Sequence, residues 1–485
     1  MKSTAVIQNS AILQRWYLCA IWQDTKPSSP ELMEIAKAAL KSCDWLYQND
    51  PDSGAKFRSL VHSAVFHSFM LNQRLASGDT EAARKLLLNQ LDFISLAIEN
   101  YDNGPNGITE ADLLWCFGTS STFASQIFDR WTAWKFTPDE VKRVAQLLDQ
   151  WTLLAGKVDT RFPSNLNLSL SICQAYDWAN VLSRKIGDAR KTMNYARAAV
   201  SKFQKHAKDF EKEPYQKAWG LAGSSGATTS IALVLGGSPQ GYKWIKSEQE
   251  DGLDVLGFHK TATRQAEEAL KIVLETPNKQ GIDWIPGKLD VAVTNYVNTL
   301  VSVKGNDAEI LRVLALKRDL FGRVFEASRT GSKAYAWAYA GNDWLTNIWN
   351  SSKGGLPEAE KISRTMLESM NQIAVKAKND VFYQLAYSEA LQGLATTLYY
   401  EARLPERADE RTKLLKDRID TLLSAEAPSR LAWNYAKVSN PELVGQAKSE
   451  MKWIAEALLG TPESESLDAR QKQHWEFILK EVSVE

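Results

Sequence analysis

Apolar side chains recur every three or four residues along most of the chain, which is the period of an amphipathic helix. The aligned positions of two clear stretches are Leu87, Leu91, Ile94 and Ile98 in the first and Val141, Val144, Leu148 and Trp151 in the second. Runs that alternate apolar and polar residues, as half-buried strands do, are hard to find. The pattern therefore predicts an all-α protein.

A second pattern marks where these helices begin. Proline suits the first turn of a helix, because its missing N–H would have no partner there, and an acid or a capping side chain beside it binds the free N–H groups. Six proline marks of this kind are Ser29-Pro30-Glu31, Thr137-Pro138-Asp139-Glu140, Ser238-Pro239, Leu356-Pro357-Glu358, Leu404-Pro405-Glu406 and Asn440-Pro441-Glu442. Three further marks use a turn of glycine with Asp or Asn: Gly78-Asp79-Thr80, Gly187-Asp188 and Gly305-Asn306-Asp307.

Most intervals between consecutive marks are about 50 residues, and a helical stretch also precedes each mark. The repeating unit is therefore a helix, a tight turn and a second, antiparallel helix. About eight or nine such hairpins would fill residues 1–485 as a single array. A sub-boundary is possible near 240–290, where the pairing of helices is hardest to assign.

The stretch NLSLSICQAYDWANVLSRKIGDARKTMNYARAAVSKFQ, residues 167–204, shows small alanines where two helices must approach closely. In this respect the chain resembles tetratricopeptide-type helical-repeat proteins, and the resemblance implies an open right-handed superhelix. It departs from that family in its repeat length, because tetratricopeptide units have about 34 residues and a W-x₂-L-G-x₂-Y pattern that is not visible here. The resemblance concerns architecture and carries no functional residues to this chain.

A unit of about 50 residues also fits a closed (α/α) toroid of about six or seven hairpins, as in many polysaccharide lyases and glycosidases. In either arrangement the first helix of each hairpin would line the inner surface. Long connections would gather at one rim, which is a common place for functional residues.

Aromatic and acidic residues concentrate on these first helices and rim loops, where they could hold an extended ligand. The candidate ligand-binding residues are Trp115, Tyr176, Trp178, Asp283, Trp284, Tyr335, Trp337, Asp343, Trp344, Tyr383, Tyr387 and Trp433. Large aromatic side chains also fill the space between packed helices. We therefore expect most of the tryptophans to belong to the core and a minority to line the inner face.

Composition narrows the possible partners. The chain has 58 basic and 58 acidic residues, so its formal net charge is zero and nothing favours nucleic acid or an anionic membrane. The four cysteines, Cys19, Cys43, Cys116 and Cys173, form no CxxC pair and are expected to be buried free thiols. The first residues have no signal-peptide pattern and no stretch is apolar enough to span a bilayer, which predicts a cytoplasmic protein.

Motifs for catalysis or cofactor binding are weak. The glycines between Gly220 and Gly226 lack the Lys-Ser/Thr of a phosphate-binding loop and are expected to allow close helix packing. His62 and His67 are five residues apart and do not share a helix face, so they cannot chelate a metal together. We expect no cofactor and no metal site.

The sequence thus predicts a helical-repeat scaffold that holds a protein or peptide partner on a concave, aromatic-rich face. The alternative is a toroidal carbohydrate-active enzyme that binds an oligosaccharide. For that alternative Asp283 and Asp290, which flank Trp284 in an expected rim loop, and Asp343 are the acids to test first.

Overall fold

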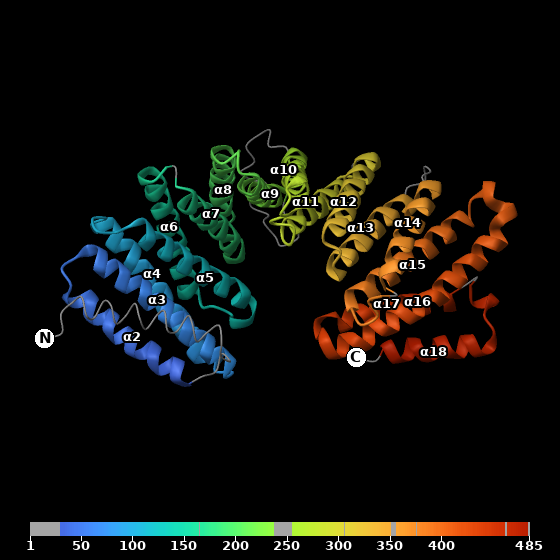
Figure 1. The fold of residues 1–485 in the computed structure, drawn as a ribbon, viewed down its shortest axis with the longest axis horizontal. Helices are drawn as coiled ribbons and strands as arrows, with labels where there is room; N and C mark the ends of the chain where they lie inside the picture. Colours follow the sequence, from blue (N-terminus) through green and yellow to red (C-terminus); the bar gives the residue numbers. More distant parts are fainter. Residues whose placement is uncertain are drawn as a thin grey trace. The chain divides into compact units, whose positions relative to one another are not determined.

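The computed structural model describes residues 30–163, 165–236, 255–304, 306–350, 356–374, 376–460 and 463–483. The described residues form helices, turns and no strand. Successive helices pair as antiparallel hairpins, so the prediction of an all-α repeat fold is confirmed (Figure 1). The chain divides into two compact units, Met1–Gln265 and Ala266–Glu485.

In the first unit the helices are α2 (Pro30–Asn49), α3 (Ser53–Ala76), α4 (Thr80–Asn103), α5 (Glu110–Trp134), α6 (Pro138–Arg161), α7 (Leu166–Ile186), α8 (Ala189–Asp209) and α9 (Pro214–Gly236). Helix α10 (Val255–Glu275) crosses the division between the units. Helix α3 packs against α5, α5 against α7 and α7 against α9, while α4 packs against α6. The first and second helices of the hairpins therefore form two separate layers, as stacked hairpins require.

In the second unit the helices are α11 (Ile285–Ser302), α12 (Asp307–Ser328), α13 (Gly331–Asn350), α14 (Leu356–Ala374), α15 (Val381–Glu401), α16 (Arg411–Ser439), α17 (Val444–Leu459) and α18 (Ala469–Ser483). Short 3₁₀ turns, Pro405–Glu410, Pro441–Leu443 and Glu463–Ser466, precede the last three helices. Helices α13, α15 and α17 contact one another in order.

The predicted marks begin helices for a local reason. Thr137 accepts a hydrogen bond from the Glu140 N–H, and the Glu140 carboxylate accepts one from the Thr137 N–H, which closes a capping box. The side chains of Asp79, Asp188 and Asn306 each accept one hydrogen bond from a backbone N–H in the first turn of α4, α8 and α12, without the reciprocal bond of a capping box. The mark Ser238-Pro239 lies outside the described residues. The marks at Pro405 and Pro441 begin 3₁₀ turns that lead into α16 and α17.

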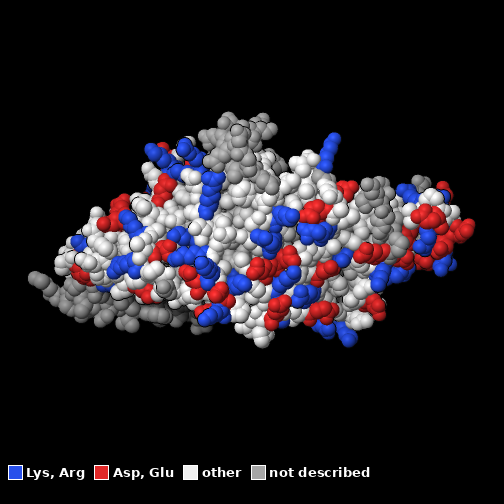
Figure 2. All heavy atoms as spheres, turned by 90° about the horizontal axis from the view of Figure 1, so that it is seen from above, with Lys and Arg blue, Asp and Glu red and all other residues white. Residues whose placement is uncertain are grey.

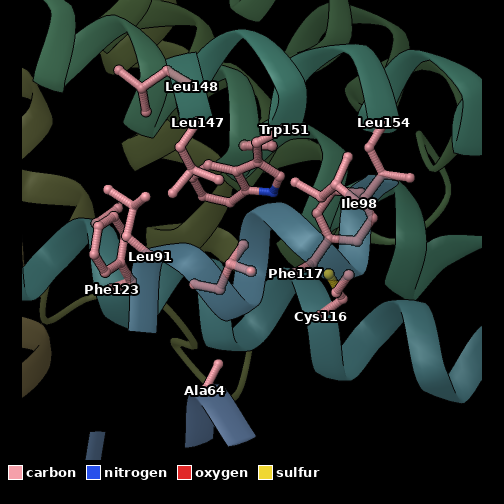
Figure 3. Packing of buried hydrophobic residues seen from close by; sticks show 14 of the residues in the cluster. Ala64, Leu91, Ile98, Cys116, Phe117, Phe123, Leu147, Leu148, Trp151 and Leu154 are labelled. Carbon is pink, nitrogen blue, oxygen red and sulfur yellow. The ribbon is translucent and has the colours of Figure 1, made fainter. Parts of the chain in front are cut away.

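The core of the first unit forms where the apolar stripes of adjacent helices meet. Trp151 of α6 is 1% exposed and lies among Ile98, Phe117 and Leu147 (Figure 3). Burial of a tryptophan removes about 150–250 Å² of side-chain surface from water. This contact therefore joins the α3–α4 and α5–α6 hairpins into one packed body.

The glycines of α9 serve packing, as expected. A Cβ at Gly223 would lie 2.1 Å from the Phe203 ring, and one at Gly220 would lie 2.8 Å from the Phe203 carbonyl oxygen. Only glycine lets α9 approach α8 this closely. The cysteine prediction is confirmed for Cys43, Cys116 and Cys173, which are buried free thiols, while Cys19 lies outside the described residues. His62 and His67 are buried.

Asp290 corrects one expectation. It lies inside α11 and not in a rim loop, because Pro286 in the first turn allows the helix to begin at Ile285. No helix among the described residues combines the length and hydropathy needed to cross a bilayer.

Candidate binding site

An open cavity of about 840 Å³ lies in the second unit, between the end of α10 and helices α12, α13 and α14. Its volume falls within the range typical of sites for small molecules and short peptide segments. The apolar part of its lining comes from Leu274, Gly322, Ala327, Trp337, Ile362 and Met366. Charged side chains surround this floor. They are Lys279, Arg318, Asp319, Arg323, Glu326, Glu358 and Lys361. We call this cavity the Trp337 cleft.

Trp337 forms a fixed aromatic wall of the cleft. Its ring stacks on Phe325 with 5.5 Å between ring centroids and 21° between planes. A Cβ at Gly322 would lie 3.1 Å from the indole Nε1, so the missing side chain at this position lets Trp337 lie close to α12. Such a ring needs little ordering when a ligand binds, which favours affinity.

Basic side chains of the cleft have unused hydrogen-bonding capacity. Arg318 donates from Nε to Asp319 at 2.8 Å and its guanidinium lies 4.2 Å from the Trp344 ring centroid, yet its buried Nη1 has no partner among the described residues. Arg323 and Lys361 form no ion pair within the described part of the chain. A buried donor without a partner costs free energy, and a ligand carboxylate would recover that cost.

Positive and negative side chains alternate on one face of the molecule. On the face shown in Figure 2, the described lysines and arginines lie interspersed with aspartates and glutamates. The Trp337 cleft likewise carries both signs of charge, because Asp319, Glu326 and Glu358 line it together with Arg318, Arg323 and Lys361.

Two of the candidate residues, Tyr335 and Asp343, lie in a group of charged and polar side chains in the same unit, apart from the Trp337 cleft. Lys317 is 2% exposed, and its Nζ lies 2.6 Å from the Asp290 carboxylate and 2.9 Å from that of Asp343. Burial alone would lower the pKa of Lys317, but the Asp343 and Asp290 carboxylates outweigh it and raise the pKa above its usual value. Lys317 therefore stays positively charged, and its two ion pairs link α12 to α11 and α13.

Two more carboxyl groups lie in this region, that of Glu389, which is half-buried, and that of Glu450, which is buried. The Asn342 amide donates to Glu389 at 2.5 Å, and Ser388 donates to Glu450 at 2.9 Å. Burial raises the pKa of Glu389, and burial together with the neighbouring Glu389 raises the pKa of Glu450 well above its usual value. Burial of the Tyr335 hydroxyl also raises its pKa. None of these groups lines the Trp337 cleft, so we interpret them as a structural network that joins α13, α15 and α17.

The remaining candidate residues are scattered. Trp344 and Trp433 are 4% exposed and Tyr383 is 9% exposed, so these three are part of the core. Tyr387 is half-buried in the same core. Asp283 and Trp284 lie immediately before α11, where the Asp283 carboxylate is 3.8 Å from Lys333 Nζ.

In the first unit, Tyr176 donates to the Thr152 carbonyl at 3.1 Å, and Trp178 packs edge-on against Phe128. Trp115 is 41% exposed. Of the twelve candidates, only Trp337 lines the Trp337 cleft.

Sequence reasoning missed Arg318, Arg323 and Lys361. A usable signal existed for the buried cations, because Lys317 and Arg318 interrupt the apolar run from Val313 to Phe321 in α12. Charged residues inside such a run are either paired or facing a site. Lys361 shows no comparable signal, because it lies on the strongly amphipathic helix α14, where charged residues are expected on the polar face.

Comparison with protein-family models and with curated proteins gives no match. Among solved structures, the chain is similar to one described as a "Circular tandem repeat protein with novel repeat topology and enhanced subunit contact surfaces". The two share 14% sequence identity with a TM-score of 0.28, over 99% of this chain and 95% of that chain. At that TM-score the likeness does not bear on the site.

Proposed function

We propose that this chain is a tetratricopeptide-like helical-repeat scaffold that binds a protein or peptide partner through the Trp337 cleft. The partner segment would place an apolar side chain against Trp337 and a nearby carboxylate against Arg323, Lys361 and the free Nη1 of Arg318. The observation that carries this proposal is a fixed aromatic wall beside the Arg318 Nη1 without a partner and beside Arg323 and Lys361, which form no ion pair among the described residues. Arginine and tryptophan are the residue types that dominate the energy of many protein interfaces.

The enzyme alternative has less support. A glycosidase needs a pair of carboxyl groups on either side of a substrate-binding cleft. Glu389 and Glu450 have the raised pKa values of such a pair, but they bind Asn342, Ser388 and Gln392 within the interior.

We also propose a cytoplasmic location. The three described cysteines are unpaired thiols, and thiols persist most readily in a reducing compartment. A protein partner in the same compartment would fit the scaffold role.

The binding proposal can be tested by fluorescence polarisation with the full chain and three pools of labelled nonapeptides. Each pool fixes a leucine in the centre and differs only in the next position, which is Glu, Gln or Lys. We expect the Glu pool to bind best, with an affinity that falls as salt is added, because exposed charges are screened.

Variants assign the binding to the cleft. The double variant Arg323→Glu/Lys361→Glu should weaken binding of the Glu pool by about tenfold, and Trp337→Ala should weaken all three pools. Lys413→Glu is the matched control, because Lys413 is an exposed lysine of α16 in the same unit that does not line the cleft. Equal binding of all pools, or an equal loss with Lys413→Glu, would refute the proposal.

A further inference from the structure

Helices α15 and α17 meet in the second unit through two carboxyl groups that are hydrogen-bonded to each other. One belongs to Glu389, which is half-buried, and the other to Glu450, which is 3% exposed. A carboxylate can only accept hydrogen bonds, so this bond exists only while one of the two groups is protonated. The two groups, which we call the Glu389–Glu450 pair, therefore hold one proton together.

The polar neighbours of the pair donate hydrogen bonds to it and bring no positive charge. Asn342 of α13 donates to Glu389 at 2.5 Å. Ser388 of α15 and Gln446 of α17 donate to Glu450 at 2.9 Å and 3.2 Å. Neither carboxyl forms an ion pair with a lysine, arginine or histidine in the described part of the chain. The proton is therefore what prevents two like charges from meeting in this contact.

The ionisable groups on the α13 side do not offset a second negative charge. Asp343 lies near Glu389, and its carboxylate raises the pKa of that residue further. The nearby cation, Lys317 of α12, is already bound to Asp343 at 2.9 Å and to Asp290 at 2.6 Å. Tyr335 faces both members of the pair, and burial together with their charge raises its pKa, so it stays neutral.

The groups on α16 and α18 are also engaged. The Ser429 hydroxyl of α16 lies 2.7 Å from the Ser388 hydroxyl. The carboxylate of Glu426 on α16 lies 3.0 Å from Arg430 Nη2 and 2.9 Å from His474 Nε2 of α18. Helix α18 contributes apolar side chains to the core that it shares with α17.

We propose that the shared proton holds the last hairpin, formed by α17 and α18, on α15, and that loss of the proton lets this hairpin open. Without the proton, two negative charges would be in contact in a place with little water, which is strongly unfavourable. In the described part of the chain no later helix packs over α17 and α18. The hairpin can therefore separate without displacing an element that follows it. This device does not depend on binding at the Trp337 cleft.

The sign of the pH dependence follows from proton linkage. In the open form both carboxyl groups are hydrated and ionise near the ordinary pKa of 4.5, whereas burial in the closed form raises the pKa of Glu450 well above that value. The closed form is thus fully favoured below pH 4.5 and loses this advantage as the pH rises through the raised pKa. Between pH 6 and 8 the opening equilibrium constant should increase about tenfold per pH unit, because opening releases one proton.

The test is hydrogen–deuterium exchange of the full chain at pH 6, 7 and 8, read by mass spectrometry. Exchange times are shortened in proportion to the chemical exchange rate, so that only changes in opening remain visible. We expect peptides from Val444–Leu459 and Ala469–Ser483 to show the tenfold increase per pH unit. Peptides from α4 in the first unit serve as the reference and should not show it.

Variants assign the effect to the pair. Glu450→Gln keeps a donor to Glu389 without a titrating proton, so we expect the opening constant of the hairpin to become independent of pH. Glu389→Gln, at the less buried position, removes the second charge and should also flatten the dependence. Glu456→Gln is the matched control, because Glu456 is an exposed acid of α17 that lies 3.8 Å from Lys452, and it should keep the wild-type increase.

The proposal would be overturned if the wild-type opening constant did not change with pH. It would also be overturned if Glu450→Gln and Glu389→Gln kept the tenfold increase, or if Glu456→Gln removed it to the same extent.

Discussion

Glu401 offers the sharpest test of how burial tunes this protein, and the test is its replacement by glutamine. The side chain of Glu401 at the end of α15 is 1% exposed, and its nearest cation, Arg407, lies 3.8 Å away. Burial, followed by the neighbouring carboxylate of Glu360 on α14, raises the pKa of Glu401 to about 7, while Arg407 opposes this shift. The folded protein therefore holds a proton that the unfolded chain releases near pH 4.5.

The sign and size of the effect follow from proton linkage. Between pH 4.5 and about 7 the folded state binds the extra proton, so raising the pH through this window destabilises the protein. The contribution of Glu401 is fully present below pH 4.5 and is lost above about pH 7, a change of about 3 kcal/mol. Glutamine has the same shape and no proton to lose. We therefore expect the free energy of unfolding of Glu401→Gln, compared with that of the wild type, to be about 3 kcal/mol more favourable at pH 8 than at pH 4.5.

The assay is urea unfolding of the wild-type and variant chains at pH 4.5, 6 and 8, followed by tryptophan fluorescence. Glu410→Gln provides the matched control, because Glu410 binds the same Arg407 at 2.9 Å but is 53% exposed. Glu360→Gln should remove part of the pH dependence, since it removes the neighbouring carboxylate. The reasoning would be wrong if Glu401→Gln gained the same free energy of unfolding at all three pH values. It would also be wrong if the wild type became more stable from pH 4.5 to 8 in the unfolding transition that Glu401→Gln shifts.

Two further predictions concern the first unit. His259 on α10 is 1% exposed, and burial lowers its pKa to about 4, so the neutral form contributes stability above pH 6.5 that is lost as the pH falls towards 4. We expect acid unfolding of this unit to begin in that window and His259→Phe to weaken its pH dependence, which calorimetry at several pH values can measure. Gly223→Ala should destabilise the unit by about 1–3 kcal/mol in urea unfolding, because the new Cβ would meet the Phe203 ring. Gly118→Ala, whose Cβ would meet nothing within 4 Å, should leave stability unchanged or increase it, and a similar loss in both variants would argue against a packing role for Gly223.

Much of the candidate site could not be read from the sequence. The sequence marks Trp337, Trp344 and Trp433 alike as candidate ligand-binding residues, but Trp344 and Trp433 are buried in the core. All three are tryptophans on helices with similar neighbours. What separates them is which helix packs over each ring, and that depends on residues far away in the chain.

The sequence by itself determined the helices and their pairing. The capping box of Thr137 and the cap of Asp188 act within three residues, so a short stretch of chain is sufficient to specify them. The period of about 50 residues then repeats the hairpin, and the glycines of α9 allow it to pack closely.

Only the tertiary structure decided which groups lost water and which lacked a partner. The Trp337 cleft brings together Leu274, Arg318 and Met366, which lie on α10, α12 and α14. The raised pKa of Glu401 depends on Glu360, which lies on another helix. Desolvation and unpaired hydrogen-bonding groups arise from the sum of all neighbours in space, and that sum exists only once the hairpins have stacked.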